Sequence, residues 1–105
     1  MKMGKQTWLF ETPPVIVSRA AVVGPLEGKG PLAGDFDRIY DDPFVGENSW
    51  EKAERKLLED AATLAVDKAG LAMDDVDLFV GGDLLNQLIS ATFASRSFGI
   101  PYLGV

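Results

Sequence analysis

The sequence contains no cysteine and no histidine among its 105 residues. A Cys–His or Ser–His nucleophilic site therefore cannot be built from this chain. Metal sites that use Cys or His ligands are excluded in the same way, and so are disulfides. We therefore expect these residues to supply no catalytic group and to hold no metal and no cofactor.

Long apolar runs and excess positive charge are missing as well. The uncharged stretches near 20–26 and 84–95 are too short to cross a membrane, and no apolar segment follows the basic start to make a secretory signal. The net charge is −6, which disfavours nucleic acid as a partner. The hydrophobic fraction of 47% argues for one folded domain rather than a disordered chain. The composition thus predicts no nucleic-acid partner and no transmembrane segment.

The clearest predicted element is a helix over residues 49–69. Asn48 is placed to cap its start, with Glu51 as the capping-box partner. Apolar residues recur at spacings of three and four, and Trp50 is expected to lie in the core. Gly70 is a natural residue to end the helix.

Three apolar segments are predicted to be strands. The first covers Val15–Val17 and Ala20–Val23, with a bend between the two parts; the others are Val76–Val80 and Ile100–Val105. A second helix over 86–98 lies between the last two. Because helices separate the strands, the sequence predicts an α/β fold with a parallel β-α-β-α-β core. The run at 78–80 also predicts burial on both faces of the sheet.

The segment from Gly24 to Asn48 is long for a connection, and it carries enough apolar side chains to be ordered against the rest of the chain. Its glycines do not have the spacing of a phosphate-binding loop. Its aspartates, from Asp35 to Asp42, do not have the spacing of a calcium-binding EF-hand. We expect an ordered surface loop, preceded by an N-terminal arm anchored by Trp8 and Phe10.

Four motifs resemble one family. The sequence resembles the N-terminal segment of the stage V sporulation protein AD family in the following stretches: Gly4-Lys5-Gln6-Thr7-Trp8, Gly30-Pro31-Leu32, the helix start Trp50-Glu51-Lys52-Ala53-Glu54-Arg55-Lys56-Leu57, and Gly82-Asp83-Leu84-Leu85-Asn86-Gln87. The resemblance covers essentially the whole chain, and the combination of its first and last motifs is specific.

The resemblance implies properties that the composition does not. It implies a thiolase-like fold of two similar halves, of which residues 1–105 would form the N-terminal portion. The superfamily's cysteine-bearing turn would follow the last strand, so no catalytic residue is carried over to this chain. The resemblance also implies a dimer that binds dipicolinic acid without turning it over. Its partners would be other stage V sporulation A proteins, at the cytoplasmic side of the forespore inner membrane.

Asp83, Asn86 and Gln87 are the candidate ligand-binding residues. They follow the second strand, and ligands of parallel sheets bind beyond the carboxyl ends of the strands. Capping of the second helix by Asp83 or Asn86 explains the same positions equally well. A carboxylate beside a dianionic ligand is unfavourable, so Asn86 and Gln87 are the preferred contacts.

Two other interpretations remain open. The chain could be the N-terminal part of an acyl-transfer enzyme of the thiolase or ketosynthase type. It could also be an inert fragment, because three strands and two helices leave apolar surfaces uncovered. That exposure predicts association, either with a second copy or with a missing C-terminal half.

Overall fold

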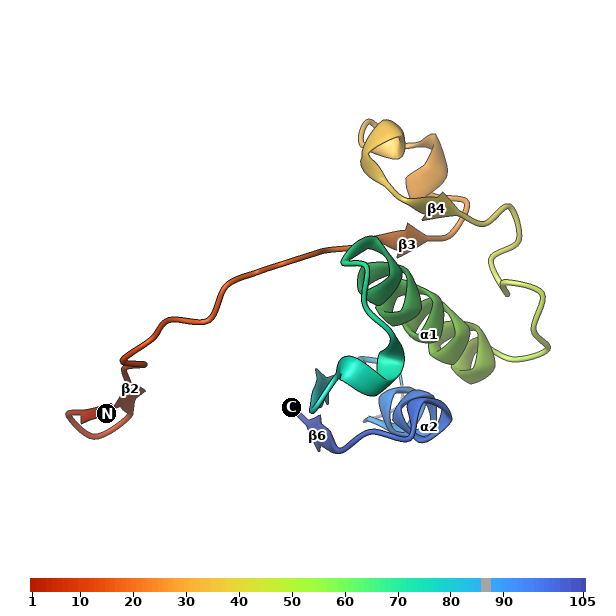
Figure 1. Ribbon diagram of the computed structural model, residues 1–105. Coiled ribbons are helices and arrows are strands. Elements are labelled where there is room, and N and C mark those ends of the chain that lie inside the picture. The colour runs from red at the N-terminus through yellow and green to blue at the C-terminus, as the bar shows by residue number, and fades with distance from the viewer. Residues whose placement is uncertain (86–87) are drawn as a thin grey trace.

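The computed structural model describes residues 1–85 and 88–105, and it shows a mixed α/β fold (Figure 1). The two α-helices are α1 (Trp50–Lys68) and α2 (Ile89–Phe98). Six short strands and three 3₁₀ turns make up the remaining regular structure of the described residues. The strands are β1 (Lys2–Met3), β2 (Thr7–Trp8), β3 (Val22–Val23), β4 (Arg38–Ile39), β5 (Phe79–Gly81) and β6 (Tyr102–Gly104), and the turns are η1 (Glu27–Lys29), η2 (Ala33–Asp35) and η3 (Met73–Asp75).

Helix α1 occupies nearly the predicted range, but a different residue caps it. The Ser49 hydroxyl accepts a hydrogen bond from the backbone N–H of Lys52 at 3.3 Å, so the predicted cap at Asn48 is wrong by one residue. A serine oxygen can satisfy one of the N–H groups that a helix leaves unpaired in its first turn. The capping box with Glu51 does not form, because Lys52 is the third residue after the cap.

The end of α1 follows the prediction closely. Gly70 has a φ of +72°, a left-handed conformation that costs glycine little. The N–H of Leu71 bonds to the Val66 carbonyl at 3.2 Å, and the N–H of Gly70 bonds to Asp67 at 2.9 Å. These two bonds define a Schellman motif, which satisfies carbonyls that the last turn would otherwise leave unpaired.

Strands β5 and β6 pair in parallel, with Phe79 opposite Tyr102 and Gly81 opposite Gly104. Helix α2 forms the crossover between them, because two parallel strands need a long connection that returns the chain to the start of the sheet. The α/β class and this parallel pair are confirmed. The first predicted strand differs: only Val22–Val23 is regular, and it pairs in parallel with β4 rather than with β5.

The connection between β3 and α1 is ordered, as predicted, and it returns to the helix. It contributes β4, Val45 is buried, and the Tyr40 hydroxyl bonds to the Asp60 carboxylate on α1. Phe44 stacks on Trp50 with ring centroids 4.0 Å apart. Trp50 is nevertheless 52% exposed, so its predicted place in the core is wrong.

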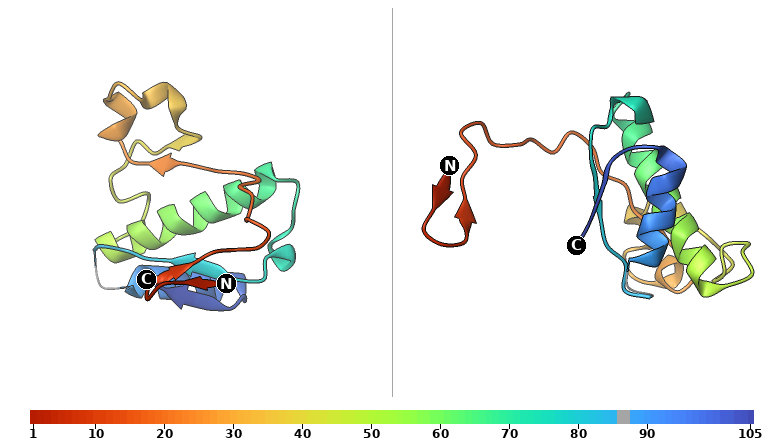
Figure 2. Two further views of the ribbon diagram at one scale, coloured as in Figure 1. Left: turned by 90° about the vertical axis from the view of Figure 1, so that its left-hand side faces the viewer. Right: turned by 90° about the horizontal axis from the view of Figure 1, so that it is seen from below.

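Helices α1 and α2 pack against each other (Figure 2). The described core includes the buried residues Ala53 of α1 and Ala91 and Ala94 of α2. Small side chains let the two helices approach closely. Phe79 of β5 adds an edge contact to Phe98 of α2, with centroids 5.7 Å apart. The opposite face of this strand is open, with Val80 52% exposed, so burial on both faces is a wrong prediction for this chain.

The N-terminal arm extends away from the helices and ends in the antiparallel β1–β2 hairpin (Figure 1). Trp8 and Phe10, the predicted anchors of the arm, are exposed and do not hold it against the rest of the described chain. Residues Val15–Val17 are extended without regular pairing, and Ile16 is 88% exposed. The arm thus makes little contact with the body before Val17 and Ser18 reach the C-terminal half of α1.

Candidate functional site

The carboxyl ends of β5 and β6 form one edge, because the two strands are parallel and end level with each other. Glycines allow the backbone to be tightly packed there. A Cβ atom at Gly82 would lie 2.6 Å from the Val105 carbonyl oxygen, and one at Gly104 would lie 2.9 Å from a methyl carbon of Leu88. Ligands of parallel sheets bind at edges of this kind, so the edge is the candidate site.

Asp83 holds the start of α2 at this edge. One carboxylate oxygen accepts the N–H of Leu88 at 2.9 Å, and the other accepts the N–H of Ala91 at 2.8 Å. Leu88 flanks the helix but has no side-chain oxygen to cap it, so Asp83 supplies the acceptor from five residues earlier. The sequence left two interpretations of Asp83 open, ligand contact and helix capping. The structure shows the helix capping.

Leu88 has a φ of +72°, which is uncommon for a residue with a branched side chain. A backbone in this region costs roughly 1–3 kcal/mol and persists only where the surroundings enforce it. The Asp83 carboxylate and the packing of Leu88 toward Gly82 and Gly104 provide that enforcement. The turn into α2 is therefore fixed at the strand edge by specific contacts.

Asn86 and Gln87, the preferred ligand contacts, lie outside the described residues. Their sequence neighbours on both sides are described. The N–H of Leu85 donates to the Glu54 carboxylate of α1 at 3.3 Å, and Leu88 is held by Asp83. Leu85 and Leu88, the described residues on either side of 86–87, are thus each held by a carboxylate.

Glu54 is a residue that sequence analysis did not single out. Its second carboxylate oxygen is buried and has no hydrogen-bond partner among the described residues. In the sequence, Glu54 looks like an ordinary polar residue of an amphipathic helix. Glu54 reaches the candidate site through its contact with Leu85, which is 31 positions away. A contact over this separation cannot be predicted from the sequence around Glu54.

Two aspartates of the loop before α1, Asp37 and Asp42, have structural roles. Asp42 accepts the N–H groups of Phe44 and Gly46 at 3.0 and 2.9 Å, which closes a turn. Asp37 bonds to Lys68 and to the N–H of Ala21, both at 2.8 Å. The hydrogen bond from Lys68, followed by the one from Ala21, lowers the pKa of Asp37.

Within residues 1–85 and 88–105, no group of three or more acidic side chains lies close enough to hold a metal ion. Gly28, in the glycine-rich segment, packs against Ile39 of β4. It therefore belongs to an ordered turn.

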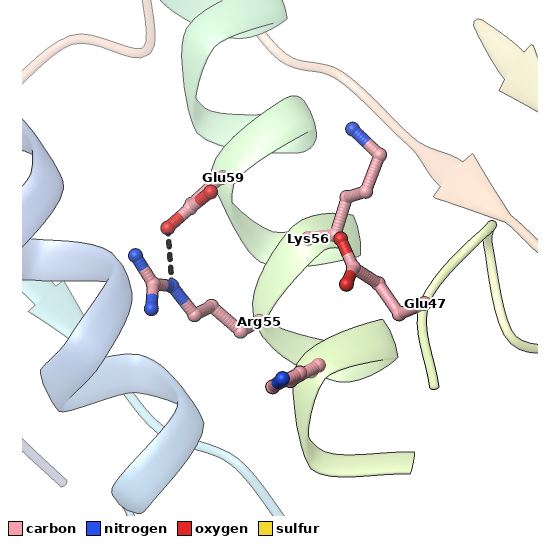
Figure 3. Close-up of a pocket in the computed structure, with 5 residues that line it drawn as sticks. Glu47, Arg55, Lys56 and Glu59 are labelled. Atoms are coloured by element: carbon pink, nitrogen blue, oxygen red, sulfur yellow. Dashed lines mark hydrogen bonds and ion pairs between the residues drawn. The ribbon is translucent and has the colours of Figure 1, made fainter. Parts of the chain in front are cut away.

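A hollow of about 340 Å³ lies beside the first turns of α1 (Figure 3). Its basic side chains are largely neutralised. Arg55 donates to Glu59 at 2.7 Å and to the Ser97 hydroxyl of α2 at 2.9 Å, and Lys56 lies 3.7 Å from Asp60. These pairs tie α1 to its surroundings, so this hollow is a weaker candidate than the strand edge.

None of the helices in the described part of the chain is long and apolar enough to cross a membrane.

Comparison with known proteins identifies the family. Residues 4–105 match the model of the family described as stage V sporulation protein AD. A curated relative, stage V sporulation protein AD of Bacillus subtilis (strain 168), is 47% identical over 100 residues, which is 95% of this chain. The chain spans about 30% of that relative's length. Because the family match covers nearly every residue, including the strand edge and both helices, the chain belongs to the stage V sporulation protein AD family.

Proposed function

We propose that the full-length protein binds dipicolinic acid without turning it over, for uptake of this diacid into the developing spore. Membership of a sporulation family gives the biological setting. The observation that carries the proposal is that Leu85, bound to Glu54, and Leu88, bound to Asp83, lie near the carboxyl edge of β5 and β6, on either side of the segment 86–87. This segment contains two amide side chains, which can donate hydrogen bonds to carboxylate groups.

In this proposal Asn86 and Gln87 contact the ligand, and Asp83 positions them. Both oxygens of Asp83 are already used by backbone N–H groups, so its charge stabilises the turn into α2. A dianion placed directly against this carboxylate would be repelled. The neutral amides offer donors without that cost.

Non-catalytic binding is the second part of the proposal. The sequence has neither cysteine nor histidine, so a cysteine nucleophile or a histidine base would have to come from outside these 105 residues. We further propose that the full-length protein is a dimer with a thiolase-like fold. It would work with other stage V sporulation A proteins at the cytoplasmic side of the forespore inner membrane.

Calorimetry on a protein of the relative's full length tests the proposal. Dipicolinic acid is titrated into the unmodified protein and into its Asn86→Ala and Gln87→Ala variants. A hydrogen bond to a charged group is worth roughly 1.5–3 kcal/mol, so each variant should bind about tenfold more weakly or worse. Asn48→Ala is the matched control, because it removes the same amide at the start of α1 and should bind normally.

Unchanged affinity in both variants would remove these residues from the ligand site. Turnover of an acyl-CoA by the same preparation, above a buffer control, would instead support an acyl-transfer enzyme and contradict non-catalytic binding.

A further inference from the structure

Another hollow lies between the first turns of α1 and α2, and it differs in character from the strand edge. It measures about 310 Å³ and is lined by side chains of both helices. This volume is at the lower end of the range of about 300–1,000 Å³ that ligand pockets occupy, so it suits a small molecule. The described lining residues are not those of the strand edge, so a ligand here would meet different side chains.

One wall of the hollow is apolar. Ile89 and Phe93 line it from α2, and their spacing of four residues places them on the same face of the helix. These side chains are 42% and 44% exposed, so much of their apolar surface is uncovered. Covering apolar surface is favourable in proportion to the area removed from water. This wall therefore favours a ligand with an apolar body.

The floor of the hollow is held in place by a contact between the two helices. Ser90 is buried, and its hydroxyl donates a hydrogen bond to the Glu51 carbonyl at 3.2 Å. In the same turns, Ala53 of α1 and Ala91 of α2 are buried as well. These contacts fix the starts of the two helices relative to each other. The hollow is therefore formed before a ligand arrives, and a ligand that fits it loses little affinity to rearrangement.

The other side of the hollow favours negative charge. Ser49 caps α1 and Ile89 is the first residue of α2, so two helix starts meet here. A helix start carries the equivalent of about half a positive charge. Lys52 adds a full positive charge and forms no ion pair with another described residue. Glu51 also lines the hollow and offsets part of this charge, so the hollow suits one anionic group rather than two.

Arg55 supplies a fixed hydrogen-bond donor to the same hollow. Its side chain reaches from α1 toward α2 (Figure 3). Nε donates to Glu59 at 2.7 Å and Nη2 donates to the Ser97 hydroxyl at 2.9 Å, whereas Nη1 has no partner among the described residues. The guanidinium carbon lies 5.9 Å from the centre of the Phe93 ring. The remaining donor is thus held beside the apolar wall, and guanidinium groups are well suited to binding carboxylates.

We propose that this hollow binds a small monocarboxylic acid with an apolar body. The carboxylate accepts hydrogen bonds from Lys52 and Arg55, and the apolar body packs against Ile89 and Phe93. This site uses other residues than the strand edge does, and it does not depend on dipicolinic acid binding there.

Benzoate is a suitable probe, because it combines one carboxylate with a rigid apolar ring. Titration calorimetry on a protein of the relative's full length should show saturable binding of benzoate. Acetate keeps the charge without the ring, and benzyl alcohol keeps the ring without the charge. Each should bind at least about tenfold more weakly than benzoate, because each loses the contacts of one side of the hollow.

Three substitutions locate the bound acid. Lys52→Gln should weaken benzoate binding about threefold to fivefold, because an ion pair at a solvent-accessible site contributes modestly. Ile89→Ala shortens the apolar wall at a partly exposed position and should weaken binding by a similar factor. Lys56→Gln is the matched control. It removes the same charge one turn further along α1, where Lys56 lies 3.7 Å from Asp60 and does not line this hollow, so it should bind benzoate normally.

Absence of saturable benzoate binding would overturn the proposal. Equal weakening in Lys52→Gln and Lys56→Gln would do the same, because only the general charge of α1 would then matter. Benzoate binding that is lost in Asn86→Ala and kept in Lys52→Gln would place the acid at the strand edge instead.

Dipicolinic acid separates this site from the one in the proposed function. It should bind Lys52→Gln as it binds the unmodified protein, and an equal loss of both ligands in this variant would show one shared site and overturn the inference. Failure of dipicolinic acid to bind the unmodified protein, with benzoate still bound, would contradict the proposed function alone.

Discussion

Replacing Asp83 by alanine removes the acceptor for two backbone N–H groups at once, those of Leu88 and Ala91. Loss of a helix cap typically costs about 0.5–2 kcal/mol of stability. Because both oxygens of this partly buried carboxylate are used, we expect the upper end of that range, about 2 kcal/mol. The strained φ of Leu88 would then be held only by its side-chain packing.

This loss translates into a measurable change in melting temperature. The entropy of unfolding is about 2.1 cal/mol/K per residue, or about 0.22 kcal/mol/K for 105 residues. A loss of about 2 kcal/mol therefore lowers the Tm by about 9 °C. Thermal unfolding followed by circular dichroism at 222 nm, which reports on α1 and α2, is the assay.

Two further variants make the test specific. Asp83→Asn keeps one acceptor oxygen, so its Tm should fall by about half as much. Asp77→Ala removes the same charge from an exposed position on the same stretch of chain, where the described residues form no hydrogen bond with it. If Asp83→Ala and Asp77→Ala melt at the same temperature, capping of α2 by Asp83 is not what stabilises this edge.

Three other predictions concern the elements that support the site. Ser49→Ala should lower the free energy of unfolding by about 1 kcal/mol in urea titrations, whereas Asn48→Ala should change it by less than about half of that. Gly70→Ala should cost about 1 kcal/mol by the same measurement, because alanine resists the positive φ of the helix end; an unchanged midpoint would contradict the assigned motif. Asp37 has a folded pKa below its ordinary value of 3.8, so its stabilising effect is present above pH 3.8 and is lost as the pH falls through the folded pKa. Asp37→Asn should therefore be less stable than the unmodified chain at pH 7, and the gap should narrow at pH 3.

Elements with strong local signals were predictable from the sequence. Helix α1 is marked by regular apolar spacing and by Gly70, and α2 ends at Phe98, as the predicted range 86–98 does. The error at the start of α1 is small, because Asn48 and Ser49 are both good caps and only the backbone geometry decides between them. Parallel pairing of β5 with β6 also followed, since it depends only on the helix between them.

Features that depend on distant contacts were not predictable in this way. Strand β4 lies within a loop and depends on β3, because the Ala21 and Val23 carbonyls accept the N–H groups of Arg38 and Tyr40. The apolar spacing of α1 places Trp50 on the helix face that should be buried. In the structure Phe44 stacks on its ring, and the side chain remains half exposed. The prediction that Val80 is buried was wrong for a related reason. The described residues cover one face of β5 and leave the other face open.

The electrostatics of the strand edge decide which side chains there can receive an anion. The chain carries a net charge of −6, and two carboxylates, Asp83 and Glu54, hold the segment between β5 and α2. The N–H groups of Leu88 and Ala91, which would normally attract an anion to a helix start, are already bound by Asp83. An anion at this edge would therefore need donors other than these two N–H groups. Asn86 and Gln87, whose side-chain amides can donate hydrogen bonds, are therefore the first positions to test.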